Sequence, residues 1–212
     1  MPSDRRAAGT APRTGRPPLS ERRRAVTRNE IARAAVRLFS ERGVAGTSVE
    51  DIAVEAGVSL RTFWRYSSGK ESCVRPLLTT GTGLMARALE DWRPGDDVSG
   101  IVDEVWHATD EAVTDLPTVL ALVRLAQREP GLRAVWLQAH DDAEAAFAGA
   151  LARATGRPVD DLRVGVRAAM INSALRAAVE YHARRTADSD DDAEGLADAM
   201  REALRTAVGG LA

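Results

Sequence analysis

The sequence predicts an all-α protein. Apolar residues recur at helical spacing along most of its 212 residues, and no alternating strand pattern of useful length interrupts them. Two capping boxes indicate helix starts, and clusters of Gly, Pro or acidic residues separate the remaining helices. We expect a small N-terminal helix-turn-helix domain of three helices, followed by a larger helical domain.

Length and composition exclude several protein classes. The chain is 44% hydrophobic and 28% charged, which is typical of a soluble globular protein. No run approaches the roughly 20 apolar residues of a membrane span, and no apolar segment follows the N-terminal arginines as in a secretory signal. Cys73 is the single cysteine, which excludes an internal disulfide and a multi-cysteine zinc site. We expect a cytoplasmic protein without a membrane partner.

Charge is divided unevenly along the chain. Residues 1–80 carry 15 Arg and Lys against 8 Asp and Glu, whereas residues 81–212 carry 14 against 23. This asymmetry indicates an N-terminal part that meets a polyanion. Residues 1–24 are rich in arginine and poor in apolar side chains, so we expect a disordered basic arm that adds non-specific attraction to phosphates.

Residues 25–72 are expected to form the helix-turn-helix domain. Its first helix is predicted to begin at Thr27, with Glu30 completing a capping box, and to end at Gly43. One apolar stripe along this helix comprises Ile31, Ala35, Leu38 and Phe39. This stripe predicts the face that packs against the other two helices.

The second and third helices flank a tight turn. Ser48 and Asp51 form a capping box at the start of the second helix. Gly57 supplies the left-handed residue that ends it, and Ser59 is the N-cap of the third helix. Two short helices joined by a glycine-containing turn predict the helix-turn-helix arrangement.

The third helix, RTFWRY, presents two kinds of side chain on opposite sides. At about 100° per residue, Arg61 and Arg65 share one side, flanked by Thr62 and Trp64. Phe63 points the opposite way, toward Val58 and Ile52 in the small core. We therefore expect the two arginines to stand outward, available to a ligand.

These residues resemble the DNA-binding domain of the tetracycline-repressor (TetR) family of transcriptional regulators. The resemblance is carried by IARAAVRLFSERG, GTSVEDIAVEAGVS and RTFWRYSSGKE, and it covers about Thr27 to Leu78. The rest of the chain resembles the family only in being helical and of suitable length. Ser67 replaces the usual aromatic or aliphatic residue after Tyr66, and Gly69 stands where a better helix former is common.

The resemblance implies double-stranded operator DNA as a partner, with the third helix in the major groove. Arg61 and Arg65 are the candidates for bidentate contacts to guanine, and Thr62 and Trp64 for contacts to a thymine methyl or the sugar-phosphate wall. Phosphate contacts are assigned to Tyr66, Lys70, Thr47 and Ser48, and Leu60 completes the candidate DNA-binding set. The alternative for Trp64 and Tyr66 is packing on the neighbouring helices, and for the arginines a solvated face.

Residues 73–212 are expected to form a helical ligand-binding and dimerisation domain. Helices are predicted at 99–115, 117–128, 131–155, 160–185 and 194–208, and a kink is predicted between Pro76 and Gly83. Two apolar stripes are candidates for a homodimer interface: Leu162, Val166, Met170, Leu175 and Val179, and then Leu196, Met200, Leu204 and Val208. The alternative is that both stripes face only the core of their own chain.

A small-molecule effector is expected in this domain because family members enclose one there. Large or polar residues on apolar faces are the pocket candidates: Trp106, Trp136, His140, Phe147 and Asn172. Each of them could instead be an ordinary core residue. The Leu- and Ala-rich faces favour a largely apolar ligand.

The function predicted in this way is that of a homodimeric repressor released from a palindromic operator by a small ligand. The alternatives are an activator or a protein-responsive regulator of the same fold, and an enzyme that uses the C-terminal pocket. The enzyme alternative lacks a nucleophile–base pair or a metal-ligand set. No cofactor and no metal site is expected, because Gly81-Thr82-Gly83 does not follow a strand and the three histidines lie on separate segments.

Overall fold

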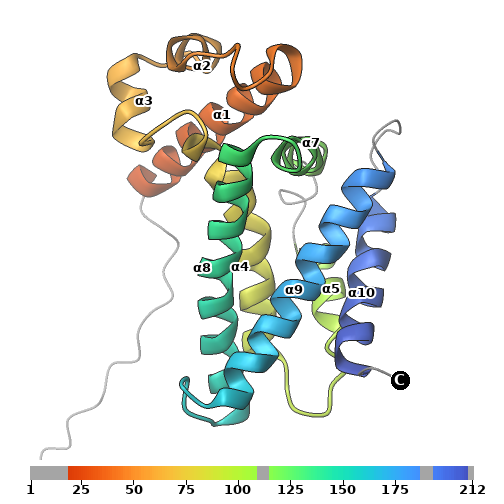
Figure 1. Cartoon of the computed structure of the whole chain (residues 1–212). Coiled ribbons are helices and arrows are strands. Elements are labelled where there is room, and N and C mark those ends of the chain that lie inside the picture. The colour runs from red at the N-terminus through yellow and green to blue at the C-terminus, as the bar shows by residue number, and fades with distance from the viewer. Residues whose placement is uncertain (1–18, 109–114, 187–192, 210–212) are drawn as a thin grey trace, which may run out of the picture.

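The computed structural model describes residues 19–108, 115–186 and 193–209, and every regular element in these ranges is a helix (Figure 1). The N-terminal group contains α1 (Leu19–Arg42), α2 (Val49–Glu55) and α3 (Leu60–Tyr66). The short 3-10 helix η1 (Ser72–Val74) leads into α4 (Arg75–Asp91). The remaining elements are α5 (Gly100–Ala108), α7 (Leu116–Ala126), α8 (Pro130–Thr155), α9 (Leu162–Arg185) and α10 (Ala193–Gly209). The all-α prediction is confirmed.

The start predicted for the first helix is wrong. α1 begins at Leu19, so Thr27 lies inside the helix and its hydroxyl donates to the carbonyl oxygen of Arg23 over 3.1 Å. The end of the expected disordered arm, residues 19–24, is therefore helical, whereas residues 1–18 lie outside the described residues. The extra turns carry exposed arginines along the N-terminal group.

The helix is not interrupted in the stretch from Pro76 to Gly83, where a kink is predicted. α4 runs without interruption through this stretch, and Pro76 lies in its first turn, where the absence of an N–H does not cost a helical hydrogen bond. Thr79 and Thr80 donate their hydroxyls to carbonyl oxygens of the preceding turn, which satisfies them inside the helix. Packing against α8 stabilises α4 despite its weak helix formers.

The larger group of helices forms one body. α4 packs along α8, and α9 packs between α8 and α10 (Figure 1). The N-terminal group joins this body through contacts of α1 with η1, α4 and α7. Arg33 of α1 donates to both carboxylate oxygens of Asp115, over 2.7 and 2.6 Å, just before α7. A single apolar core therefore runs from the N-terminal helices into the body.

The two apolar stripes have different environments. Leu196, Met200 and Leu204 are buried against their own chain, as is Leu175, which corrects the expectation that they face a partner. Leu162, Val166 and Met170 of α9 are exposed by 79%, 47% and 40%. Among the described residues, no helix is long and apolar enough to span a bilayer.

Candidate nucleic-acid interface

The turn between α2 and α3 is built by two caps and one glycine. The N–H of Asp51 donates to Ser48 Oγ over 3.0 Å, and the N–H of Ser48 donates back to the carboxylate of Asp51 over 2.9 Å. The Ser48 hydroxyl, 2.6 Å from the Asp51 carboxylate, and the Ser48 N–H together lower the pKa of Asp51. Gly57 adopts φ +65°, which a side chain would strain, and Ser59 accepts the N–H of Thr62. The caps and turn predicted here are confirmed.

Phe63 fixes the orientation of α3. Its ring is fully buried, as is the side chain of Ile52 on α2. Trp64 packs edge-on against Phe63, with ring centroids 5.3 Å apart, and is itself 53% exposed. Burying Phe63 turns the opposite side of α3 to solvent, as the periodicity predicts.

The outer side of α3 is cationic and accessible. Arg61, Arg65 and Leu60 are exposed, and Thr62 is half-buried. The guanidinium of Arg65 lies 4.8 Å from the centre of the Tyr66 ring and donates to its hydroxyl over 3.4 Å. Tyr66, half-buried against the core, therefore holds Arg65 in place.

Thr47 and Lys70 are directed at the protein's own backbone. Thr47 is only 2% exposed, and its hydroxyl donates to the carbonyl oxygen of Gly43 over 2.9 Å. The Thr47 side chain therefore does not reach a phosphate, which corrects the expectation. Lys70 Nζ donates to the carbonyl oxygens of Val44 (2.6 Å) and Thr47 (3.0 Å). Ser48 is exposed, with its hydroxyl bonded to Asp51.

This arrangement predicts that Lys70→Met destabilises the fold. The change leaves two loop carbonyl oxygens without their charged donor, so we expect a loss of about 1–3 kcal/mol in the free energy of unfolding. Urea unfolding measures this loss, with the exposed Arg61→Ala as the matched cationic control. Unchanged stability in Lys70→Met would leave Lys70 with only its predicted phosphate contact.

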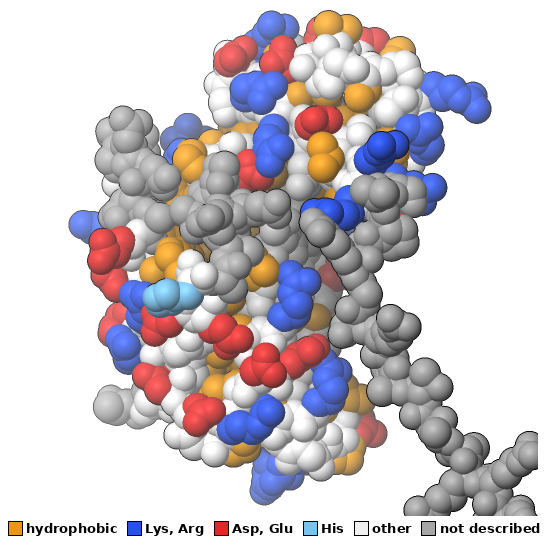
Figure 2. Space-filling model, turned by 180° about the vertical axis from the view of Figure 1, so that it is seen from behind, with side chains coloured by type: hydrophobic (Ala, Val, Ile, Leu, Met, Phe, Trp, Pro, Cys, Tyr) orange, Lys and Arg blue, Asp and Glu red, His pale blue; other side chains and the backbone are white. Residues whose placement is uncertain are grey.

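Basic residues continue onto α1. Arg22, Arg23, Arg24 and Arg28 are all exposed on its N-terminal half. Viewed from behind, Figure 2 shows basic side chains along the edge of the N-terminal helices. These arginines extend the positive charge of the N-terminal group, and Arg22, Arg23 and Arg24 lie in a helix where the sequence predicts a disordered basic arm.

A polar network links α8 and α9 inside the body. His140 Nδ1 donates to Asn172 Oδ1 over 2.7 Å, and Asn172 donates back to the carbonyl oxygen of His140 over 3.1 Å. Trp136 packs edge-on against His140 and donates to Glu180 over 2.8 Å. Arg133 donates to the same carboxylate oxygen over 2.6 Å. Trp136, His140 and Asn172 are thus brought together, whereas Glu180 and Arg133 were not predicted.

The other two pocket candidates lie apart from this network. Phe147 is fully buried two turns further along α8, and Trp106 is half-buried on α5. Trp106 Nε1 and His140 Nε2 are buried without a hydrogen-bond partner among the described residues. Because Nδ1 carries the proton toward Asn172, His140 Nε2 presents an unused lone pair. In the described part of the chain, no three His, Cys, Asp or Glu side chains converge as a metal site.

The network lowers the pKa values of two of its side chains, Glu180 and His140. Burial would raise the pKa of Glu180, but hydrogen bonds from Trp136 and Arg133 and the nearby Arg176 hold it below its usual value. Burial also lowers the pKa of His140, assisted by Arg176 and Arg133 and opposed by the hydrogen bond that His140 donates to Asn172 and by Glu180. His140 is therefore neutral at neutral pH.

Stability is expected to fall when the pH is lowered from 7.5 to 5.5. Below about pH 6.5, His140 binds a proton in the unfolded chain but stays neutral in the folded chain. The free energy of unfolding therefore falls by up to about 1.4 kcal/mol per pH unit because of this group. Urea unfolding of His140→Gln should show a smaller loss between these pH values than the wild type. His107→Gln, at an exposed histidine, should behave like the wild type. Equal losses in all three proteins would contradict this assignment.

Comparison with known proteins gives a family for both parts of the chain. Residues 31–77 match the family model described as bacterial regulatory proteins, tetR family, and residues 100–212 match the model described as MftR C-terminal domain. The HTH-type transcriptional regulator TcmR of Streptomyces glaucescens is 31% identical over 153 residues, which are 68% of this chain and 67% of that protein. The HTH-type transcriptional repressor Rv3405c of Mycobacterium tuberculosis is 30% identical over 106 residues, 48% of this chain and 56% of that protein.

The fold agrees with these matches. A TetR-family transcriptional regulator from Mesorhizobium loti superposes with a TM-score of 0.52, covering 88% of this chain and 97% of that one at 20% identity. The helix-turn-helix geometry, the exposed arginines of α3 and both family models point to the same conclusion. The chain belongs to the TetR family of transcriptional regulators, which bind DNA and are not enzymes.

Proposed function

We propose that the protein is a homodimeric repressor that binds a palindromic operator and is released by a small, largely apolar ligand. Residues 25–72 are its DNA-binding part and residues 73–212 its regulatory and dimerisation part. The observation that carries the proposal is the outer side of α3, where Arg61 and Arg65 are exposed on a helix anchored by the buried Phe63. The relative from Mycobacterium tuberculosis that is named a repressor supports repression over activation.

Base readout is assigned to the two arginines. Each guanidinium can donate to O6 and N7 of a guanine in the major groove, which is worth about 1–3 kcal/mol of discrimination. Arg65 is the better organised of the two, because Tyr66 lies beneath its guanidinium. The flanking residues Leu60, Thr62 and Trp64 are assigned to a thymine methyl or the sugar-phosphate wall, and Ser48 and Tyr66 to phosphates.

Dimerisation is assigned to α9. One short helix reads few base pairs, so operators of this kind need two copies of it about 34 Å apart. Leu162, Val166 and Met170 recur every four residues, and Tyr181 continues the exposed apolar face. Such a face on a soluble protein supports an isologous contact with a second copy of the chain.

Effector binding is assigned to the region around Trp136, His140 and Asn172. Buried aromatic and aliphatic side chains surround a few convergent polar atoms there, which is the usual composition of a small-molecule site. A ligand hydroxyl or amide would donate a hydrogen bond to the unused lone pair of His140 Nε2. α8 packs along α4, and α4 leads to the DNA-binding helices. A ligand that changes the position of α8 can therefore change the position of the DNA-binding helices.

The proposal predicts that Arg65→Ala relaxes base preference. Genomic fragments retained by the protein would define the operator, and binding to that operator with each base changed would measure the preference. We expect the variant to lose about 1–3 kcal/mol of discrimination at one guanine per half-site. The control is Arg87→Ala, at an exposed arginine of α4. Unchanged discrimination in Arg65→Ala would contradict the base-reading assignment.

A further inference from the structure

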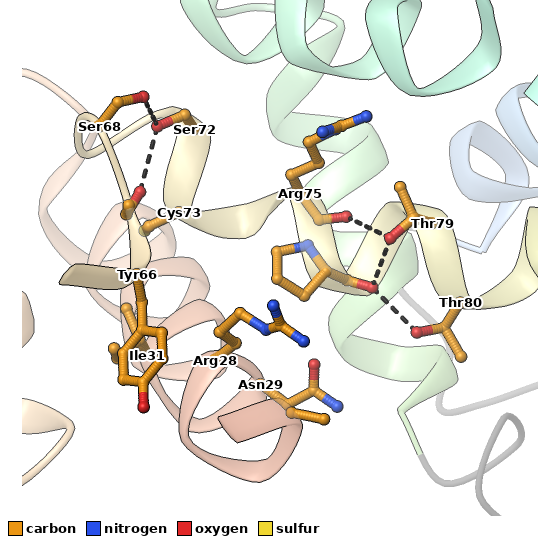
Figure 3. Close-up of a pocket in the computed structure, with 13 residues that line it drawn as sticks. Arg28, Asn29, Ile31, Tyr66, Ser68, Ser72, Cys73, Arg75, Thr79 and Thr80 are labelled. Carbon is orange, nitrogen blue, oxygen red and sulfur yellow. Dashed lines mark hydrogen bonds between the residues drawn. The ribbon is translucent and has the colours of Figure 1, made fainter. Parts of the chain in front are cut away.

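An open cleft of about 580 Å³ lies where the DNA-binding helices meet the body (Figure 3). One wall is α1, the second is the segment that follows α3, and the third is the first turns of α4. None of the described side chains that line it is acidic. Tyr66, which the proposed function assigns to a phosphate contact, lines one edge of this cleft, whereas Arg61, Arg65 and the residues around His140 do not.

The α1 wall supplies nitrogen donors. Arg28 is exposed, and its guanidinium makes no hydrogen bond or ion pair with the described residues. Figure 3 shows Arg28 aimed across the cleft toward α4, with the amide of Asn29 beside it. An arginine in a cleft without a carboxylate leaves its planar set of N–H donors open to an anion from solution.

The second wall is made of hydroxyls. Ser72 Oγ lies 3.1 Å from both Ser67 Oγ and Ser68 Oγ, and the carbonyl oxygen of Gly69 accepts from Ser67 and Ser72. Cys73 closes the floor, and burial raises the pKa of its thiol to about 12. The thiol is therefore protonated and adds no negative charge. Ser67 and Ser72 already donate to Gly69, so each can donate to a bound oxygen only by exchanging that hydrogen bond.

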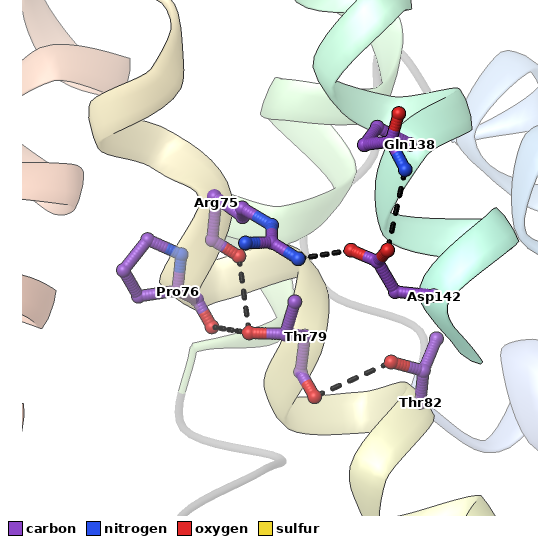
Figure 4. A network of polar contacts seen from close by, with 6 residues as sticks. All are labelled: Arg75, Pro76, Thr79, Thr82, Gln138 and Asp142. Carbon is purple, nitrogen blue, oxygen red and sulfur yellow. Dashed lines mark hydrogen bonds and ion pairs between the residues drawn. The ribbon is translucent and has the colours of Figure 1, made fainter. Parts of the chain in front are cut away.

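The third wall connects the cleft to the body. Thr79 and Thr80 line it with their hydroxyls bound to carbonyl oxygens of α4. Arg75, at the rim, turns away to pair with Asp142 of α8, which also accepts from Gln138 over 3.2 Å (Figure 4). Arg75 therefore fastens α4 to α8, and Asp142 balances its charge.

We propose that this cleft binds a small anion that carries a phosphate group. The N–H donors of Arg28 and Asn29 on the α1 wall and the serine hydroxyls on the second wall can approach a tetrahedral oxyanion from two sides, and the volume leaves room for a small organic group. The free donors of Arg28 provide the main contact. Ser67 matters for the space itself, because a large side chain at this position would project into the cleft.

Binding here would couple the anion to DNA recognition. The walls belong to both the DNA-binding helices and α4, so an anion that bridges them fixes their relative orientation. A ligand that favours one orientation shifts the population of the DNA-binding conformation. This coupling rests on the proposed function, whereas anion binding itself does not.

The test of binding uses the full-length protein and inorganic phosphate as the probe. Melting temperature is measured in increasing phosphate and in sodium chloride of equal ionic strength. We expect a saturable rise with phosphate in the wild type, lost in Arg28→Gln and in Ser67→Phe, which fills the cleft. Arg22→Gln, at an exposed arginine of the same helix outside the cleft, should keep the rise. No phosphate-specific rise, or an equal loss in Arg22→Gln and Arg28→Gln, would overturn the proposal.

Operator affinity separates a free anion from a phosphate of the DNA backbone. We expect phosphate to change wild-type affinity at constant ionic strength and to leave Arg28→Gln unaffected. Without phosphate, Arg28→Gln should bind operator within about threefold of Arg22→Gln, since both remove one exposed charge. A much weaker Arg28→Gln, with no phosphate effect on the free protein, would identify a DNA contact and overturn the proposal. If no DNA fragment is bound at all, the proposed function fails while the melting test still decides on the anion.

Discussion

Replacing Val166 and Met170 together by glutamate is expected to convert the protein into monomers and to weaken operator binding by about a hundredfold or more. Both side chains lie on the exposed apolar face of α9, one turn apart. In an isologous interface each substitution appears twice, so four carboxylates would meet in a surface that excludes water. Charges buried there without partners are costly.

Sedimentation and gel retardation measure the two consequences. A matched control is Ala134→Glu with Ala145→Glu, which adds the same charge at exposed positions of α8. The control should remain dimeric and bind with nearly wild-type affinity. A double α9 variant that stays dimeric would show that another surface holds the two copies together.

Phe63→Ala is expected to have the largest effect on stability. Its ring is fully buried beneath α3, and removing such a ring from a core costs about 3–5 kcal/mol. Because Phe63 holds α3 against α2, operator binding should be lost in the same variant even where the body remains folded. Chemical unfolding and gel retardation of one preparation measure both effects.

The neighbouring Trp64→Ala provides the contrast. Trp64 is about half exposed and touches Phe63 only by an edge. Its removal should change stability by less than about 1 kcal/mol and still weaken DNA binding. If Trp64→Ala destabilised the protein as much as Phe63→Ala, Trp64 would be a packing residue, as the alternative interpretation of the sequence holds.

Local signals in the sequence were sufficient for the helix-turn-helix. Ser48 and Ser59 cap helices where the pattern indicates, and Gly57 adopts the left-handed conformation of the turn. Cap residues and the glycine act through their own backbone neighbours, so a short window contains the information. The inward direction of Phe63 followed from helical periodicity for the same reason.

Thr27 shows where such a signal misleads. A threonine followed three residues later by glutamate fits a capping box, but the same hydroxyl can bond to the carbonyl four residues earlier inside a helix. Which of the two applies depends on whether residues 19–26 are helical. The three consecutive arginines in this stretch are also typical of a solvated arm. Arginine is a good helix former, so the same three residues can equally extend α1 toward its N-terminus.

Long-range pairing lies beyond a local reading. The approach of Asn172 to His140 across two helices, and of Glu180 to Trp136 and Arg133, depends on how α8 and α9 dock. Apolar spacing also cannot distinguish a face toward the chain's own core from one toward a second copy. The buried Leu204 of α10 and the exposed Val166 of α9 carry similar local signals.

Methylation interference at guanine N7 tests most directly whether the outer side of α3 reads base edges. On the selected operator, methylated guanines should block binding at two positions related by the palindrome and about one helical turn apart. Arg61→Ala with Arg65→Ala should abolish this interference, and Arg87→Ala should retain it. Binding that is insensitive to N7 methylation, or interference that persists in the double variant, would contradict readout by these arginines.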